Sequence, residues 1–432
     1  MEKFDRQLRI WGNHGQHFLE TSNVCVVGSS ALACEILKNL ALPGVKCFTM
    51  ILSEADEPQL DEFWDMSAWN VTKVSWDAVQ MSSYSFWEKF ALVIDTTGHN
   101  GYLKTLKEIR KPPVLLCQML KNNGFVSFLS PEPHFVVESH QKHRVPDLRL
   151  TESRDDLSRF YTKLLENAPD LADYPFAAIL YQARENVERK YPFHSISREE
   201  LKRQIIYLQE NTSQGFQSPS FSEALRFVHL ALPGFEPLPE NVKQCLLLSD
   251  KSCETPFNRG AQTLLRALDS FLKTPHSRGQ LPISGVVPDM ETSSELYTAL
   301  RGAYSAAAER DVKIFYDLVC RSDPQIRLEE IRLFCKNCRY IKAVEPVQDL
   351  SKLEAYLNEG DGVSISIFKS IFDSCSTKRM SPNEVRRYYP CISFMAGIAA
   401  QEAIKIITHQ FVPLENTLLY EGDSGEVKTF KV

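Results

Sequence analysis

Residues 23–52, NVCVVGSSALACEILKNLALPGVKCFTMIL, decide the fold. The first five of them are a short apolar run that ends at Gly28 and predicts a buried strand. A helix is expected over Ser30–Leu42, because apolar residues recur there at three-and-four spacing, at Ala33, Ile36, Leu37 and Leu40. Pro43-Gly44 ends that helix, and residues 45–52 predict a second apolar strand. Strand, helix and strand within about 30 residues indicate a right-handed βαβ unit.

The rest of residues 1–150 extends this unit into an α/β sheet. Two further strands are expected at Ala91–Asp95 and Val114–Cys117, with a helix at Tyr102–Ile109 between them. Such continuous apolar strands are typical of buried parallel sheets. Gly124–Leu129 reads as an antiparallel edge strand. We therefore predict an α/β fold with a doubly wound, Rossmann-like sheet.

Residues 151–385 change to helical periodicity and predict a large, mostly helical insertion. The expected helices are Leu157–Leu165, Pro175–Lys190, Arg198–Leu208, Phe221–Leu232, Gly260–Leu272 and Ser294–Cys320. Residues 386–432 return to the earlier style, with a small-residue helix at Ile392–Thr408 and strands at Leu418–Tyr420 and Glu426–Phe430. This last stretch is expected to complete the α/β domain.

The composition is that of an ordinary globular protein. Of 432 residues, 43% are hydrophobic and 24% are charged, which argues against disorder. A net charge of −6 argues against a nucleic-acid-binding domain, whose signature is clustered Lys and Arg. The acidic N-terminus excludes a secretory signal peptide, and the most apolar stretch, Cys391–Ala400, is too short to span a bilayer. We expect a cytoplasmic or nuclear protein whose 11 cysteines are reduced.

The turn after the first strand lacks the features of a working nucleotide site. Such a turn needs glycines that let the backbone approach phosphates, and only Gly28 remains. Ser30 adds a side chain where a phosphate would sit, and Leu52 replaces the acid that would hold a ribose, with Glu54 and Asp56 as weaker substitutes. The sequence predicts a fold that has stopped binding nucleotide. It also argues against a nicotinamide-dependent oxidoreductase.

Two other patterns favour structural interpretations. Cys335 and Cys338 form a lone C-x-x-C, and because a structural zinc needs four ligands, we interpret both as packing residues and expect no metal site. None of the cysteines stands beside a recognisable catalytic constellation. In the opening FDRQLRIWG, residues 4–12, the pattern alone indicates a short amphipathic helix with solvated Arg6 and Arg9.

Five islands carry a resemblance to a known family. They are FDRQLRIWG (4–12), EILKNLALPGV (35–45), VVESH with VPDLRL (136–150), RGQLPISGVVPDM (278–290) and GIAAQEAIKIITHQFVPLENTLLYEG (397–422). Together they resemble the regulatory halves of the ubiquitin-activating-enzyme superfamily. Island 278–290 is similar to a stretch of the regulatory, amyloid-precursor-protein-binding subunits of neddylation activating enzymes. The first and last islands also resemble sumoylation regulatory subunits.

The resemblance implies an obligate heterodimer of two related adenylation folds of the ThiF/MoeB type. The catalytic subunit binds ATP and Mg²⁺, adenylates the C-terminus of a ubiquitin-like modifier and carries the thioester cysteine. This chain is then non-catalytic, binds no cofactor, nucleic acid or membrane, and supplies Arg6 to the ATP site of its partner. Gly28, Ser30 and Leu52 become remnants of a nucleotide turn.

Two alternatives stay open at this point: a sumoylation regulatory subunit, and a free-standing interaction protein without an enzyme partner. Two segments depart from the family pattern. Ser53–Tyr84 is short and acidic, and Leu350–Arg386 is shorter than expected. The first departure bears on the surface that pairs with the partner, and the second on contacts of the helical insertion.

Overall fold

A computed structural model describes most of the chain and divides it into two compact units. The described residues are 4–52, 70–75, 84–98, 112–141, 144–151, 154–166, 170–191, 195–213, 215–232, 238–251, 259–323, 325–374 and 380–432. The sheet unit comprises Met1–His140, Gln244–Arg266 and Tyr340–Val432, and the helical unit comprises Gln141–Lys243 and Ala267–Arg339. The helix expected at residues 102–109 and most of segment 53–84, apart from residues 70–75 and 84, lie outside the described residues.

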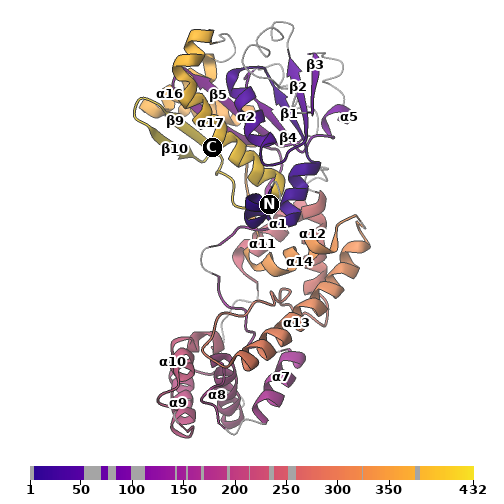
Figure 1. The fold of residues 1–432 in the computed structure, drawn as a ribbon, viewed down its shortest axis with the longest axis vertical. Coiled ribbons are helices and arrows are strands. Elements are labelled where there is room, and N and C mark those ends of the chain that lie inside the picture. Colours follow the sequence, from indigo (N-terminus) through magenta and orange to yellow (C-terminus); the bar gives the residue numbers. More distant parts are fainter. Residues whose placement is uncertain are drawn as a thin grey trace. The chain divides into compact units, whose positions relative to one another are not determined.

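Within the described residues, the sheet unit contains eight strands in the order β10-β9-β6-β5-β4-β1-β2-β3 (Figure 1). Their bounds are β1 Asn23–Val27, β2 Cys47–Leu52, β3 Asn70–Ser75, β4 Leu92–Asp95, β5 Val114–Leu120, β6 Asn123–Leu129, β9 Thr417–Glu421 and β10 Glu426–Phe430. Pairs from β3 through β5 are parallel, and pairs from β5 through β10 are antiparallel. A mixed α/β fold with a central, mostly parallel sheet is thus confirmed.

The predicted βαβ unit forms β1, α2 (Ala31–Ala41) and β2. Strand β1 pairs with β2 on one side and with β4 on the other. The sheet therefore extends from β1 on both sides, as in a doubly wound fold. The expectation of an edge strand at residues 124–129 is wrong. β6 lies inside the sheet because β9, about 290 residues later, covers its free side, with Ser127 opposite Thr417.

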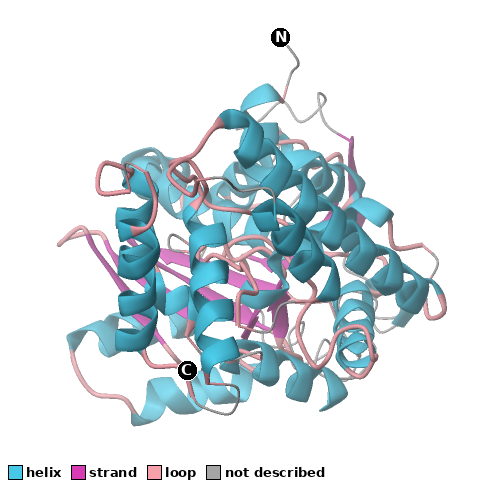
Figure 2. Cartoon of the chain, turned by 90° about the horizontal axis from the view of Figure 1, so that it is seen from below, coloured by secondary structure: helices cyan, strands magenta, loops and turns pink. Residues whose placement is uncertain are grey.

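Helices cover both faces of the sheet. One face packs against α1 (Asp5–Thr21), α2 and α17 (Pro382–Thr408) through a core that includes Leu37, Ala399 and Ala403. The other packs against α5 (Tyr84–Trp87), α15 (Leu350–Glu359) and α16 (Val363–Ser374). Residues 350–374, which the sequence placed in the helical insertion, therefore contribute to the sheet unit. The strands are magenta in Figure 2.

Helix α17 begins ten residues earlier than expected. Ser381 and Glu384 form a capping box, in which the Ser381 hydroxyl accepts from Glu384 N and the Glu384 carboxylate accepts from Ser381 N, and Pro382 occupies the first turn. By length and composition α17 is apolar enough to cross a membrane, yet 61% of its apolar window is buried. That burial is typical of a core helix.

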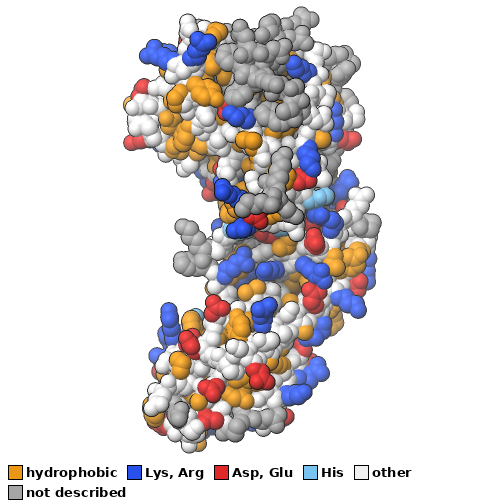
Figure 3. All heavy atoms as spheres, in the orientation of Figure 1, with side chains coloured by type: hydrophobic (Ala, Val, Ile, Leu, Met, Phe, Trp, Pro, Cys, Tyr) orange, Lys and Arg blue, Asp and Glu red, His pale blue; other side chains and the backbone are white. Residues whose placement is uncertain are grey.

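The helical unit and its connections contain the other elements. The helices are α7 Asp155–Glu166, α8 Phe176–Lys190, α9 Arg198–Glu210, α10 Pro219–Arg226, η2 Val228–Ala231, α11 Glu240–Lys251, α12 Arg259–Leu272, α13 Ser294–Cys320, α14 Leu328–Asn337 and η3 Cys338–Tyr340. Two short strands that pair with each other, β7 His134–Val136 and β8 Lys342–Val344, belong to the sheet unit. The helix expected at 221–232 is split into α10 and η2. In the unit's core the hydroxyls of Tyr161 and Tyr304 lie 2.9 Å apart. On the face drawn in Figure 3, Lys and Arg mix with Asp and Glu.

Candidate functional site at the glycine turn and the first helix

Threonine side chains fill the glycine turn. Gly28 has φ +97°, a conformation that favours glycine. A Cβ on Gly28 would lie 2.7 Å from Thr97 Cγ2 and 2.8 Å from Thr96 Oγ1. Thr96 and Thr97 therefore pack directly against the turn and leave no room for a side chain at position 28.

Ser30 satisfies the N-terminus of α2. Its hydroxyl oxygen accepts from Ala33 N over 3.2 Å, and its hydroxyl donates to Thr96 Oγ1 over 3.3 Å. Thr96 Oγ1 in turn donates to Val27 O over 2.9 Å. Ser30 therefore caps one of the N–H groups at the N-terminus of α2, the kind of group that binds phosphate in nucleotide folds.

The described strand ends beside the turn offer no ribose acceptor, and Glu54 and Asp56, the weaker substitutes, lie outside the described residues. Leu52 is buried at the end of β2 and has no polar side-chain atom. Asp95, at the end of β4, is fully buried, and its Oδ1 accepts from Thr97 N, Thr97 Oγ1 and Gly98 N. Asp95 thus fixes the loop that fills the turn. No sequence pattern points to this role, because Asp95 stands out only as the end of an apolar strand.

The first helix presents Arg6 to solvent. Helix α1 contains a break at Gly12 (φ 66°, ψ 174°), so that Arg6 lies on a short N-terminal segment. Arg9 Nη2 lies 3.0 Å from Asp5 Oδ2, one turn away. Within the described part of the chain no hydrogen bond or ion pair engages the Arg6 guanidinium. Arg6 is therefore available to a group outside the chain.

The end of this short segment is buried and bonded to the other end of the chain. Trp11 is buried, and its ring meets Phe411 edge-on with centroids 5.6 Å apart. Trp11 O accepts from Gln410 Nε2 over 2.9 Å. Sequence reasoning missed Gln410, which has no local pattern and lies in the last island. Trp11 thus lies on the apolar side of the short amphipathic helix that the pattern of residues 4–12 indicates.

Island 278–290 is an extended strap held by buried polar groups of the helical unit. Asp311, fully buried on α13, accepts from Ile283 N over 2.8 Å, and also from Arg154 Nη1. Arg149 Nη2 donates to Leu281 O over 2.8 Å. These hydrogen bonds hold the strap against α13. Arg149, Arg154 and Asp311 escaped the sequence reading because they are separated along the chain.

The C-x-x-C pair lies in the core of the helical unit. Cys335 and Cys338 are both buried, and burial raises the pKa of Cys335 and raises that of Cys338 to about 12. Cys338 Sγ contacts Pro282 O at 3.7 Å. The interpretation of both as packing residues is confirmed. Among the residues that the structure describes, no cluster of three or more His, Cys, Asp or Glu side chains is arranged to hold a metal ion.

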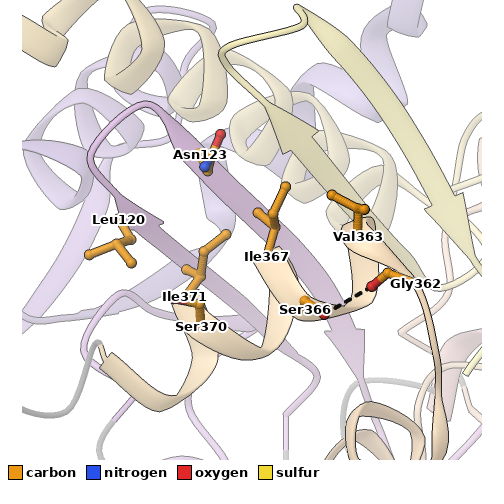
Figure 4. Close-up of a pocket in the computed structure, with 8 residues that line it drawn as sticks. All are labelled: Leu120, Asn123, Gly362, Val363, Ser366, Ile367, Ser370 and Ile371. Carbon is orange, nitrogen blue, oxygen red and sulfur yellow. Dashed lines mark hydrogen bonds between the residues drawn. The ribbon is translucent and has the colours of Figure 1, made fainter.

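An apolar groove lies on the other face of the sheet, between α16 and the β5–β6 hairpin (Figure 4). Its volume is about 580 Å³, and Val363, Ile367 and Ile371 form one stripe of α16 along it. The polar residues in its lining are Ser366, Ser370 and Asn123, and Asn123 Oδ1 already accepts from Gly422 N. No lining residue is charged, so the groove has no evident acid, base or nucleophile.

Comparisons with known proteins give a consistent result over the whole chain. No family model matches. The chain is 27% identical over 470 aligned residues to the NEDD8-activating enzyme E1 regulatory subunit of Saccharomyces cerevisiae, with all of both chains covered. It is 26% identical over 538 residues to the protein of that name from Xenopus laevis, covering all of this chain and 98% of the relative. The NEDD8-activating enzyme E1 regulatory subunit AXR1 of Arabidopsis thaliana is 24% identical over 524 residues, with 100% and 96% covered.

Proposed function

From its full-length homology to NEDD8-activating enzyme E1 regulatory subunits, we propose that this chain is the regulatory subunit of a NEDD8-activating enzyme. It pairs with a catalytic subunit that adenylates the modifier's C-terminus and then holds it as a thioester. The observation that carries the proposal is similarity across all of the chain and nearly all of each relative. The sheet unit is then an adenylation fold of the ThiF/MoeB type, in a protein of the cytosol or nucleus.

The filled glycine turn supports a division of labour between the two subunits. The support for it is that Ser30 caps α2 and hydrogen-bonds to Thr96 beside the turn, and that Leu52 has no polar side-chain atom for a ribose. ATP and Mg²⁺ then bind at the catalytic subunit. Titration of the isolated chain with Mg²⁺ and ATP in a calorimeter should give no binding heat, while the heterodimer binds one nucleotide. Binding by the isolated chain would contradict this assignment.

Arg6 is the residue that this chain contributes to the reaction. Adenylation concentrates negative charge on the phosphates as pyrophosphate leaves, and a guanidinium beside them stabilises that charge. Arg6 suits the role because it is exposed and unpaired within the described residues, while Arg9 is held by Asp5. In the heterodimer Arg6 then reaches the ATP site of the partner subunit.

Exposed apolar side chains near Arg6 supply part of the pairing surface. Ile10 is 51% exposed on α1, and Leu42 is 60% exposed just after α2. The two elements meet where Phe4 Cζ lies 3.6 Å from the position of a Cβ on Gly44. Obligate interfaces are apolar, so Ile10 and Leu42, which are exposed in the isolated chain, would be buried against the catalytic subunit in the heterodimer.

Reconstitution tests the proposal. This chain is mixed with the NEDD8 catalytic subunit, ATP, Mg²⁺ and NEDD8, and thioester formation is followed on a gel. Thioester is expected only when both subunits are present, and Arg6→Ala should slow adenylation while Arg203→Ala, an exposed arginine of the helical unit, should not. Activity with the sumoylation catalytic subunit instead would support that alternative. No pairing with either would favour a free-standing interaction protein.

A further inference from the structure

Four buried or half-buried side chains meet where the first helix contacts the segment after α17. We propose that this group, the Gln410 cluster of Gln410, His14, His140 and Glu138, positions Arg6 for its action at the partner's ATP site. The inference rests on the proposed function. Gln410 is a positioning residue here, because it acts on Arg6 through the main chain of Trp11.

The short segment that carries Arg6 is attached at both ends. At its start, Phe4 packs beside Gly44, whose φ of +124° and tight surroundings exclude a side chain. At its end, Trp11 is buried, and Gly12 breaks the helix. The break means that the second segment of α1 does not by itself fix the direction of the first. The direction therefore depends on what holds Trp11.

Gln410 supplies that hold. Its amide nitrogen lies 2.9 Å from Trp11 O and 2.6 Å from His14 Nε2, so its two hydrogens serve both acceptors. Its amide oxygen lies 3.4 Å from His140 Nε2, which donates to it. With all of its amide atoms engaged, Gln410 has one orientation. The Trp11 carbonyl, and with it the last turn of the Arg6 segment, is fixed in direction.

The main chain around Gln410 is itself fixed. His409 and Phe411 both have positive φ, 53° and 56°. His409 O accepts from Val137 N over 2.9 Å, and Phe411 N donates to Glu138 O over 2.7 Å. These bonds place Gln410 beside Glu138, and Glu138 lies on the segment that follows β7. Gln410 is thus aimed by the backbone of the sheet unit and does not depend on α1 for its position.

Glu138 and the two histidines complete the cluster. Glu138 Oε1 lies 3.1 Å from His14 Nε2, and its Oε2 lies 3.4 Å from His140 Nε2. The Phe411 ring stacks on His140 with centroids 4.0 Å apart. One carboxylate therefore lies against both imidazoles that touch the Gln410 amide. Because His14 Nε2 accepts from the Gln410 amide, it carries no proton for Glu138. Glu138 Oε2 and the Phe411 ring therefore hold only the His140 ring, which keeps it beside the amide oxygen of Gln410.

A double-mutant cycle tests the proposal in the reconstituted heterodimer. Gln410→Met keeps the side-chain size but removes both donors, and Gln410→Glu keeps polarity but cannot donate to Trp11 O. Each should lower kcat for adenylation roughly fivefold, the worth of about one net hydrogen bond, with KM for the modifier unchanged. In an Arg6→Ala background neither should lower it further. Gln217→Met, at an exposed position of the helical unit, is the matched control.

The outcomes separate the inference from the function on which it rests. If Arg6→Ala slows adenylation and Gln410→Met slows the Arg6→Ala enzyme by a further fivefold, Gln410 has only a structural role and the inference fails alone. If Arg6→Ala has no effect, the proposed role of Arg6 fails, and the inference with it. If Gln410→Met does not fold, His140→Leu replaces it, because it removes the donor to Gln410 Oε1 at a half-exposed position. His140→Leu should lower kcat for adenylation less than Gln410→Met does, and this decrease must also vanish in the Arg6→Ala background.

Discussion

The side-chain amide of Gln410 donates to the main-chain carbonyl of Trp11 over 2.9 Å and joins two residues 399 positions apart in sequence. The bond links the first island of family resemblance, 4–12, to the last, 397–422. Both islands build the sheet unit, where α1 and α17 pack on the same face. This hydrogen bond therefore fixes the position of α1 relative to the segment that follows α17.

Gly15→Ala should loosen this junction. A Cβ at position 15 would lie 2.8 Å from Gln410 Nε2 and 2.8 Å from Trp11 Cβ, closer than real Cβ contacts. Because both neighbours are buried, the overlap is expected to cost about 1–3 kcal/mol, measured as a lower midpoint of thermal unfolding of the sheet unit.

Gly302→Ala is the control, with the opposite sign. Position 302 lies in the interior of α13, and a Cβ there meets nothing within 4 Å. Replacing a helical glycine by alanine in open space should stabilise the helical unit by about 0.5–1 kcal/mol. A Gly15→Ala variant as stable as wild type would show that the Gln410–Trp11 contact tolerates displacement.

Asp311→Ala should release the strap of the helical unit. Asp311 Oδ1 and Oδ2 lie 2.7 and 2.8 Å from Arg154 Nη1, and the same carboxylate holds His276 and Ile283 N. Its removal leaves the Arg154 cation buried without its anion, which costs about 3–5 kcal/mol. Limited proteolysis should then cut within residues 278–290.

The same helix offers a matched control in Glu309→Ala. Glu309 pairs with Arg332 at 3.0 Å, but both side chains are exposed, so the pair is screened by water. Its loss should change stability by less than about 1 kcal/mol. Equal protease resistance of the Asp311→Ala and wild-type proteins would refute the role assigned to Asp311.

The cysteines should differ sharply in reactivity. Burial raises the pKa of Cys34 and Cys245, each to about 12, and that of Cys338 to the same value, so these thiols stay protonated and covered near neutral pH. Cys47 is exposed at the start of β2. Among the described cysteines, iodoacetamide at pH 7.5 should label Cys47 first, as peptide mapping would show.

Cys47→Ser serves as the control for that assignment and should remove the fast labelling. The buried cysteines should react only after denaturation. Fast labelling of Cys338 in the native protein would mean that the C-x-x-C pair is accessible and reactive, against the packing role derived from its burial.

Local patterns were enough to predict the βαβ unit but not the start of α17. The spacing of apolar residues in α2 is set by its own packing face, so sequence and structure agree within a residue or two. In α17, Pro390 reads as a helix boundary, yet the helix runs through it from a capping box at Ser381. The neighbours of β6 could not be foreseen either, because its partner Thr417 is remote in sequence.

In the candidate site, too, local features could be predicted and contacts between remote residues could not. Gly28, Ser30 and Leu52 lie within one βαβ unit, so the nucleotide turn was recognisable as incomplete. The side chains that fill it, Thr96 and Thr97, follow a different strand. The Gln410 cluster brings together residues from three distant segments, and spacing along a chain carries no information about such a meeting. The islands of resemblance contain all its members except His14, but do not say which of them touch.

Acid should destabilise the sheet unit through two stacked histidines. The rings of His134 and His409 are parallel within 18° with centroids 4.8 Å apart, and burial lowers the pKa of both below the ordinary histidine value of about 6.5. Both stay neutral in the folded state, while the unfolded chain binds protons as the pH falls below about 6.5. Stability is therefore complete above that pH and falls below it, by about 1.4 kcal/mol per pH unit for each histidine that stays neutral.

Urea unfolding between pH 7.5 and 5.5 measures this slope. His134→Phe keeps an aromatic ring against His409 but removes one of the two titrating groups, so the slope should fall by about half. His229→Phe is the matched control, because His229 is exposed in η2 of the helical unit, and its slope should equal that of wild type. The comparison uses slopes and not absolute stabilities, so any packing cost of the larger ring cancels. A His134→Phe slope equal to wild type would show that the stacked pair does not titrate on unfolding.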